Sequence, residues 1–320
     1  MAGAWTITTG SRLHFGPLAW KPSRGRDFGG WGVMLETPRT VVRVGEIDAL
    51  SPPPPTTRTS HSRSAEILGR LQGLASRIDT PELFVDVLEE PPAHCGFGSG
   101  TQLALAISAG LARINLDHRP PATALALMAG RGLRSAVGIH GFDLGGLIVD
   151  AGKLPADAVG ELAAHAPVPA DWRFVLVRPG AAVGLTGDKE AAAFDDLPPF
   201  SDSLTDRLRE IVFNEVVPAV ERNECERFAV ALDEYGMLVG EAFRPCQGGV
   251  VHPAALPIWT ALRDRGLRGI AQTSWGPTLA IVRDNPSDAE RIAAVVREVA
   301  PAADIQIASP RNIGAEITSI

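Results

Sequence analysis

The chain has 320 residues, of which 45% are hydrophobic and 21% are charged. This composition excludes a disordered chain, and the length predicts two domains or one large domain. The formal net charge is −7 and the acidic excess lies in residues 166–320, so neither half has the basic character of a nucleic-acid-binding protein.

The first half of the chain mixes strand and helix patterns. β-Branched residues predict strands at 5–9 and 40–45, and the glycine-rich segment 24–38 between them predicts a hairpin or a tightly turned loop. Proline-rich residues 51–62 are expected to form a surface loop. The other elements expected here are helices at 64–77, 101–114 and 121–130 and strands at 82–90 and 145–152.

The second half has the same mixed character. Residues 166–171 hold two prolines and are the candidate linker, so we expect domains at 1–168 and 169–320. The expected elements are strands at 172–179, 266–272, 278–284 and 304–310 and helices at 202–222, 224–241, 254–265 and 287–299. Strands and helices without a regular parallel alternation predict the α+β class.

The cysteines and the N-terminal sequence bear on the compartment. Cys95, Cys225 and Cys246 lack metal-binding spacing, and their odd number fits a reducing environment. The N-terminal sequence shows no basic segment followed by an apolar run, and no apolar stretch reaches the roughly 18 residues that a membrane helix needs. We therefore expect a cytoplasmic protein with neither a membrane nor a nucleic-acid partner.

The strongest motif is the glycine-rich sequence HCGFGSGTQ. Gly96, Gly98 and Gly100 at alternate positions let the backbone approach a ligand, and the following helix directs its positive end at the same point. Ser99 and Thr101 add hydroxyl groups. The motif lacks the lysine of a Walker loop and the acidic residue of a dinucleotide fingerprint. It predicts a phosphate or pyrophosphate site, with a ligand-free tight turn as the alternative.

A second group of candidate residues follows in RGLRSAVGIHGFDLGGLIVD. Arg131 and Arg134 have the spacing of one helical turn and can bind an anion from the same side of a helix end. His140, Asp143 and Asp150 are candidate bases, and the two aspartates are candidate metal ligands. The glycines of this segment predict a loosened backbone. The alternatives are solvated arginines, a structural histidine, a turn cap at Asp143 and a strand end at Asp150.

Two weaker candidate segments lie near the ends of the chain. TSWGPT places Ser274 and Gly276 in a turn that either covers a ligand or only closes a hairpin. Arg12 and Arg26 lie near aromatic residues and flexible glycines, where they can hold an aromatic acid by ring stacking and carboxylate pairing. GxSxG, HExxH and CxxC motifs are absent, which argues against a serine hydrolase, a zinc protease and a zinc ribbon.

Three motifs in order resemble the kinase superfamily named for galactokinase, homoserine kinase, mevalonate kinase and phosphomevalonate kinase (GHMP). GFGSGTQLALAIS is similar to its phosphate loop, SAVGIHGFDLGG to the segment with its catalytic aspartate, and QTSWGPTLAI to its C-terminal glycine motif. The resemblance implies two domains, the first like ribosomal protein S5 domain 2 and the second ferredoxin-like. His140 stands where these kinases place the aspartate, which disfavours phosphate transfer.

The individual residues of the motifs are more similar to one branch of this superfamily, the β-ribofuranosylaminobenzene 5'-phosphate synthases. TQLALA, SWGPT, SRLHFGPL and FGGWGV carry this resemblance. It implies a phosphoribosyltransferase that joins phosphoribosyl pyrophosphate to 4-aminobenzoate or 4-hydroxybenzoate for methanopterin-type pterin synthesis. Pyrophosphate and CO2 are released.

The resemblance also implies how the motifs are used. The loop, with Gln102 beside it, holds the pyrophosphate together with Mg²⁺, for which Ser99 and Thr101 are the candidate ligands. Arg12, Arg26, Arg131 and Arg134 are candidates for the 5'-phosphate or the benzoate carboxylate. A homodimer is expected from the frequency of such assemblies. The alternative functions are an ATP-dependent small-molecule kinase and a non-catalytic protein that binds a phosphorylated metabolite.

Overall fold

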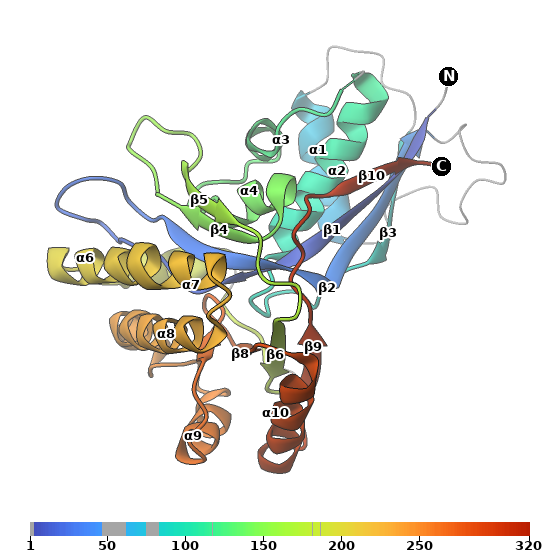
Figure 1. Ribbon diagram of the computed structural model, residues 1–320. Coiled ribbons are helices and arrows are strands. Elements are labelled where there is room, and N and C mark those ends of the chain that lie inside the picture. Colours follow the sequence, from blue (N-terminus) through green and yellow to red (C-terminus); the bar gives the residue numbers. More distant parts are fainter. Residues whose placement is uncertain (1–2, 47–61, 75–82, 117, 181, 186) are drawn as a thin grey trace.

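The structure is a computed structural model that describes residues 3–46, 62–74, 83–116, 118–180, 182–185 and 187–320. Its described strands form two antiparallel sheets with helices packed on both (Figure 1). Most of the expected surface loop, at 51–61, and the end of the helix expected at 64–77 lie outside the described residues.

The first sheet joins the two ends of the chain. Its strand order is β10-β1-β2-β4-β5, and β3 also pairs with β2. Its strands are β1 (Ala4–His14), β2 (Gly30–Glu46), β3 (Leu83–Glu89), β4 (Leu147–Asp150), β5 (Leu162–Ala166) and β10 (Glu316–Ser319). β5 and β10 were not expected from the sequence. Because β10 pairs with β1, the chain returns to its first sheet at its end.

Strand β2 begins ten residues earlier than the sequence predicts. The expected hairpin or turned loop at 24–38 is wrong from Gly30 onward, where the chain is already extended. A Cβ on Gly32 would overlap the carbonyl oxygen of Leu13 on the neighbouring strand. The glycine is therefore needed for close strand approach, and its presence does not signal a turn.

Four helices lie on one side of the first sheet (Figure 1). They are α1 (Ser62–Leu74), α2 (Ser99–Asn115), α3 (Ala122–Met128) and α4 (Val137–Leu144). Leu103 and Ile107 of α2 are buried against Ile7, Val42 and Val44 of the sheet. This packing fixes the position of the start of α2, where the glycine-rich loop lies.

Helix α4 replaces the loosened backbone predicted around Gly138 and Gly141. The prediction is wrong because both glycines lie inside the helix. A Cβ on Gly141 would overlap the sulfur of Met34 on β2. Close contact between α4 and the sheet, and not backbone freedom, accounts for this glycine.

The second sheet has the strand order β7-β8-β6-β9. It consists of β6 (Arg173–Arg178), β7 (Ile270–Gln272), β8 (Leu279–Arg283) and β9 (Asp304–Ala308). The helices of this half are α5 (Gly187–Asp196), α6 (Asp202–Ile211), a π-helical turn (Val212–Val216), α7 (Val217–Glu221), α8 (Cys225–Gln247), α9 (Leu256–Asp264) and α10 (Pro286–Val299). With α8 and α10 as its crossover helices, the second sheet forms a β-α-β-β-α-β unit. The predicted α+β class and the predicted ferredoxin-like half are therefore confirmed.

One hydrophobic cluster joins the two sheets. Trp31 of β2 contacts the ring of Phe228 of α8 edge-on with 5.7 Å between centroids. Trp172, which precedes β6 of the second sheet, contacts the same ring. The predicted boundary between domains at 168 and 169 stays a prediction. In the part of the chain that the structure describes, no helix is long and apolar enough to cross a bilayer.

Gly110 of α2 gives a test of this packing. A Cβ there would lie 2.6 Å from Cβ of Val44 and 3.0 Å from Ile7, so Gly110→Ala forces α2 away from the sheet. We expect the free energy of unfolding to fall by about 1–3 kcal/mol in denaturant titrations. Gly69→Ala on α1 is the matched control, because nothing lies within 4 Å of its Cβ. A control variant less stable than Gly110→Ala would contradict the packing argument, since alanine favours an open helix position by about 0.5–1 kcal/mol.

Candidate active site

The glycine-rich loop turns directly into helix α2. Gly98 adopts a left-handed conformation with φ +66° at the position before the first helical residue. Its carbonyl accepts hydrogen bonds from the amides of Thr101 and Gln102 at 3.1 and 3.2 Å. The first amides of a helix have no acceptor within the helix, so those of Ser99 and Gly100 are available to an anion.

The TSWGPT turn packs against this loop. A Cβ on Gly96 would overlap Oγ1 of Thr273, so the two segments touch through the bare backbone of the glycine. Ser274 donates its amide hydrogen to the carbonyl of His14 on β1 at 2.6 Å. The strands on either side form the predicted hairpin. The structure therefore brings together the loop, the turn with Ser274 and Gly276, and the Arg12 end of β1.

Two adjoining cavities open beside the loop. The first, of about 480 Å³, is called the loop cavity and is lined by residues 96–101 together with Arg63, Glu66, Ile67, His94 and Leu185. The second, of about 220 Å³, is called the side cavity and is lined by Arg12, His14, Leu133, Ser135, Phe194 and Ser274 along with two glycines. Thr101, Arg131 and Arg134 line both cavities, so the two spaces share a wall.

Arginines dominate the charge around the loop. A Cβ on Gly100 would lie 3.0 Å from Arg63 Nη2 and 3.9 Å from Arg131 Nη2, and one on Gly98 would lie 3.3 Å from Arg12 Nε. Burial and the neighbouring Arg63 lower the pKa of Arg131. Of the described residues lining the two cavities, four are arginines and one, Glu66, is acidic. The site is electropositive and suited to a polyanion.

Arg131 and Arg134 lie on the segment between α3 and α4, and not on a helix as their spacing predicted. The reason is that α3 ends before them, where Arg131 donates its amide hydrogen to the carbonyl of Ala126 at 2.7 Å. Arg134 lies over the ring of Phe194, 5.2 Å from its centroid. Both side chains still reach the shared wall of the cavities.

Gln102 has a structural position next to the loop. Its side chain is fully buried, where it accepts a hydrogen bond from the hydroxyl of Thr9 at 2.7 Å and donates to the carbonyl of Gly138 at 2.8 Å. These bonds fasten α2 to β1 and α4, and Gln102 lines neither cavity. Its predicted part in binding stays a prediction.

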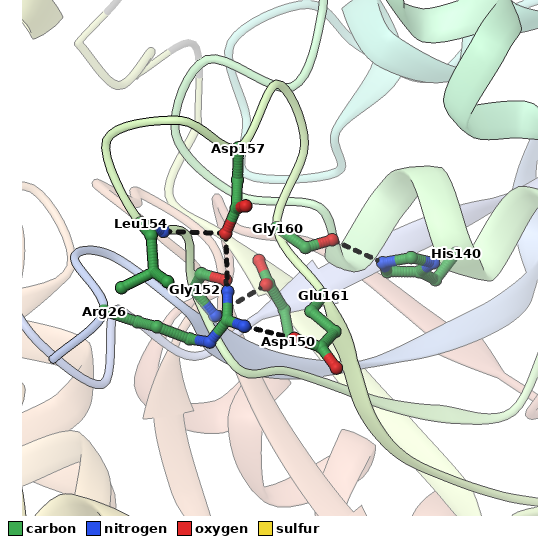
Figure 2. A network of polar contacts seen from close by, with 8 residues as sticks. All are labelled: Arg26, His140, Asp150, Gly152, Leu154, Asp157, Gly160 and Glu161. Atoms are coloured by element: carbon green, nitrogen blue, oxygen red, sulfur yellow. Dashed lines mark hydrogen bonds and ion pairs between the residues drawn. The ribbon is translucent and has the colours of Figure 1, made fainter.

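Arg26 lies in a network of its own (Figure 2) and lines neither cavity. It forms ion pairs with Asp157, at 2.6 Å, and with Glu161. These two acceptors lie on the segment between β4 and β5, whose Gly152 carbonyl also accepts a hydrogen bond from Arg26. Arg26 thus has a partner set different from that of the arginines at the glycine loop.

Asp150 and His140 also contact the segment between β4 and β5 (Figure 2). The fully buried carboxylate of Asp150 accepts hydrogen bonds from the amides of Ala136, at 2.6 Å, and Gly152, at 2.9 Å. Burial raises the pKa of Asp150, and these two amides oppose the shift. Nε2 of His140 lies 2.9 Å from the carbonyl oxygen of Gly160. Asp150 thus stabilises the start of α4 at Ala136, and His140 connects α4 to the segment between β4 and β5.

Asp143 also has structural partners. One oxygen accepts the amide hydrogen of Ala122 at the start of α3, at 2.8 Å, and the other pairs with Arg119 at 2.7 Å. Neither cavity is lined by His140, Asp143 or Asp150. Their predicted catalytic parts stay predictions.

The cavity residues that the sequence pattern did not predict as site residues include Arg63, His14, Ser135 and Phe194. His14 had a usable signal, because alternate residues of a strand face the same side and Arg12 was already a candidate. Arg63 and Phe194 come from helices that no motif marked. Their positions follow from tertiary packing.

The residues near the loop offer few ligands for a metal ion. In residues 3–46, 62–74 and the other described segments, no group of three or more histidine, cysteine, aspartate or glutamate side chains is gathered as a metal centre. Ser99, Thr101 and Glu66 do line the same cavity. Mg²⁺ is commonly held by one or two protein oxygens plus substrate phosphates, and this donor set fits that mode.

Three curated archaeal proteins are similar to this chain, each named β-ribofuranosylphenol 5'-phosphate synthase. That of Methanothermobacter thermautotrophicus is 28% identical over 331 aligned positions, covering 97% of each chain. That of Methanocaldococcus jannaschii is 25% identical and covers 97% of this chain and 99% of its own. No family model matches. The resemblance predicted from the motifs is confirmed, since these relatives carry the name of a synthase of this type, and the prediction of an enzyme is confirmed.

Solved structures show the same fold. Mevalonate diphosphate decarboxylase from Staphylococcus aureus has a TM-score of 0.66 at 15% identity and covers 99% of this chain and 98% of its own. Homoserine kinase from Cytophaga hutchinsonii has a TM-score of 0.60 at 14% identity, with the same coverage. The chain thus has the predicted GHMP-kinase-like fold.

The contacts of Asp150 give a test of its role. Asp150→Ala leaves two buried amides without an acceptor, so we expect the free energy of unfolding to fall by about 2–6 kcal/mol. Denaturant titration measures the change. Asp206→Ala, at an exposed position of α6, is the control and is expected to change stability by less than about 0.5 kcal/mol. Full stability of Asp150→Ala combined with lost turnover would instead assign Asp150 to catalysis.

Proposed function

We propose that this chain is a phosphoribosyltransferase that joins phosphoribosyl pyrophosphate to a benzoate carrying a para amino or hydroxyl group. The products are a β-ribofuranosylarene 5'-phosphate, pyrophosphate and CO2. This reaction supplies methanopterin-type pterin synthesis. The relatives support it, since they are named for the corresponding phenol product. The substrates are small molecules, and a cytoplasmic location and a homodimer stay predictions from the sequence.

The observation that carries the proposal is the arginine-lined glycine loop. Arg63 and Arg131 lie at the loop, and Arg63 also contacts the Ser99 hydroxyl at 3.4 Å. Pyrophosphate gains negative charge as its bond to ribose breaks. Fixed cations and helix amides at the leaving group stabilise that charge without reorganising. The loop cavity therefore suits the leaving group of the donor.

The two cavities suit the stereochemistry of the reaction. The donor carries its pyrophosphate in the α configuration, whereas the product in the relatives' names has the β configuration. The acceptor therefore attacks from the face opposite the pyrophosphate. A donor held in the loop cavity presents its anomeric carbon toward the shared wall at Thr101 and Arg131. The acceptor then approaches from the side cavity.

We propose that Mg²⁺ accompanies the donor. Ser99, Thr101 and Glu66 would hold it in the loop cavity. When bound, it would neutralise charge on the pyrophosphate. The chain's own residues orient the donor through the loop amides and arginines.

The two alternative functions are not favoured. A kinase needs a base near its acceptor hydroxyl, but His140 replaces the expected aspartate and contacts Gly160. Asp143, the other candidate, is held by Ala122 and Arg119. A non-catalytic binding protein does not explain the similarity to three synthases over most of the chain.

A direct assay tests the function. Purified protein with phosphoribosyl pyrophosphate, Mg²⁺ and carboxyl-labelled 4-hydroxybenzoate or 4-aminobenzoate is expected to release labelled CO2 and pyrophosphate in equal amounts. ATP in place of the donor is expected to give no product. The absence of CO2 and arylriboside with both acceptors would refute the proposal, and ATP consumption with an alcohol would restore the kinase alternative.

Arg131 tests the assignment of the loop cavity. Arg131→Ala removes a charged donor from the leaving group, so we expect kcat/KM for the pyrophosphate donor to fall roughly 10- to 100-fold. Steady-state kinetics with the donor varied gives this number. Arg291→Ala is the control, because Arg291 is exposed on α10 and pairs only locally with Asp288. Equal kinetics in the two variants would place the donor elsewhere.

A further inference from the structure

A histidine and a serine side chain meet in the side cavity. Nε2 of His14 lies 3.2 Å from Oγ of Ser135. Oγ of Ser135 also accepts the amide hydrogen of Val137 at 3.2 Å. With that side of the oxygen occupied, the serine hydroxyl can donate its hydrogen to His14.

His14 lies deeper in the protein than Ser135. It is 7% exposed, whereas Ser135 is half-buried and more open to the cavity. Burial, and secondly the charge of Arg12, lower the pKa of His14 well below its usual value. His14 is therefore uncharged at neutral pH and keeps one ring nitrogen as an acceptor. A ligand group at Ser135 meets a hydroxyl backed by a neutral imidazole.

The remaining walls suit a single aromatic ring. Phe194 lines the cavity, and Arg134 lies over its ring. The volume of about 220 Å³ is below the roughly 300–1,000 Å³ of pockets for larger ligands. His14 and Ser135 line only the side cavity, whereas Arg131 and Arg134 lie at the wall shared with the loop cavity. The side cavity thus has Arg131 and Arg134 at the wall that it shares with the loop cavity. His14 and Ser135, with Arg12 beside His14, lie on walls of its own.

We propose that the side cavity binds a 4-hydroxybenzoate, with its para hydroxyl on Ser135 and His14 and its carboxylate toward Arg131 and Arg134. This inference rests on the proposed function and assigns its acceptor. The orientation places the ring carbon that carries the carboxylate next to the anomeric carbon of the donor. That carbon is the one that must form the new bond.

The pair also supplies a path for the para proton. As the ring carbon attacks, its bond to the anomeric carbon forms and the bond from that carbon to pyrophosphate breaks. The para hydroxyl shifts its proton toward Oγ of Ser135, which shifts its own toward Nε2 of His14, and the ring takes on cyclohexadienone character. Loss of CO2 leaves its electron pair in the ring, and the protons return along the same hydrogen bonds to restore the phenol. No oxidant or further reactant is needed.

The acceptor's para group decides how much this path contributes. The amine of 4-aminobenzoate can release electron density to the ring without losing a proton. The hydroxyl releases more when its proton leaves, so the rate with 4-hydroxybenzoate depends more strongly on His14 and Ser135.

The test compares Ser135→Ala, His14→Gln and their double variant with the wild type. We expect each single variant to lower kcat with 4-hydroxybenzoate by roughly 10²-fold or more and to leave KM for the pyrophosphate donor within about threefold. The double variant is expected to be no worse than the poorer single variant by more than about threefold, because the two groups act as a unit. His165→Gln, at an exposed histidine of β5, is the control.

Every outcome bears on the proposal. If buried His14→Gln fails to fold, as circular dichroism would reveal, Ser135→Ala decides alone. Unchanged kcat and acceptor KM in Ser135→Ala overturns the inference, as does a wild type that uses 4-aminobenzoate but not 4-hydroxybenzoate. An equal loss with both acceptors overturns the proton path. A wild type without turnover on either acceptor refutes the proposed function itself, which is a separate result.

Discussion

The missing side chains of Gly96 and Gly98 are the constraint on which the site depends. At Gly96 any Cβ would overlap Thr273, and at Gly98 the left-handed backbone starts α2 beside Arg12. Three distant segments meet there: the end of β1, the loop before α2 and the turn between β7 and β8. A larger residue at Gly96 would separate the turn from the loop and move both away from β1. The amides at the start of α2 and the side cavity therefore depend on the same two glycines.

The cations gathered at this point are unfavourable in the free protein. Burial first, and then the like charges of Arg63 and Arg70, disfavour the charged form of Arg131, as its lowered pKa shows. Glu66 opposes this only in part. On the proposed function, a polyanionic donor would remove this repulsion on binding, so part of its binding free energy would come from relief of the strain. Electrostatics that lower the stability of the protein would thus favour the donor and its departing pyrophosphate.

The sequence predicted elements with strong local signals and failed where a glycine serves a distant neighbour. The apolar periodicity of α2 and the hairpin around TSWGPT were correct because their patterns are complete within a few residues. Gly32 and Gly141 looked like chain breakers, yet they lie in a strand and a helix, because the atoms that exclude a Cβ belong to other elements. The same limit applies to the arginines, because the local sequence does not distinguish Arg26 from Arg131. What separates them is a distant partner: Asp157, which accepts a hydrogen bond from Arg26, lies 131 residues away.

The kinase-like scaffold explains where a base for this reaction can lie. At the position of the kinase aspartate, His140 is directed to the carbonyl of Gly160 and lines neither cavity. A kinase needs its base next to the transferred phosphate, since the attacking hydroxyl lies there. A carbon nucleophile activated through its ring loses a proton from the opposite end of that ring. A base for that proton belongs at the far end of the acceptor site, where β1 supplies His14 and the start of α4 supplies Ser135. The same fold can therefore exchange phosphate transfer for ribosyl transfer when the base moves from one end of the acceptor to the other.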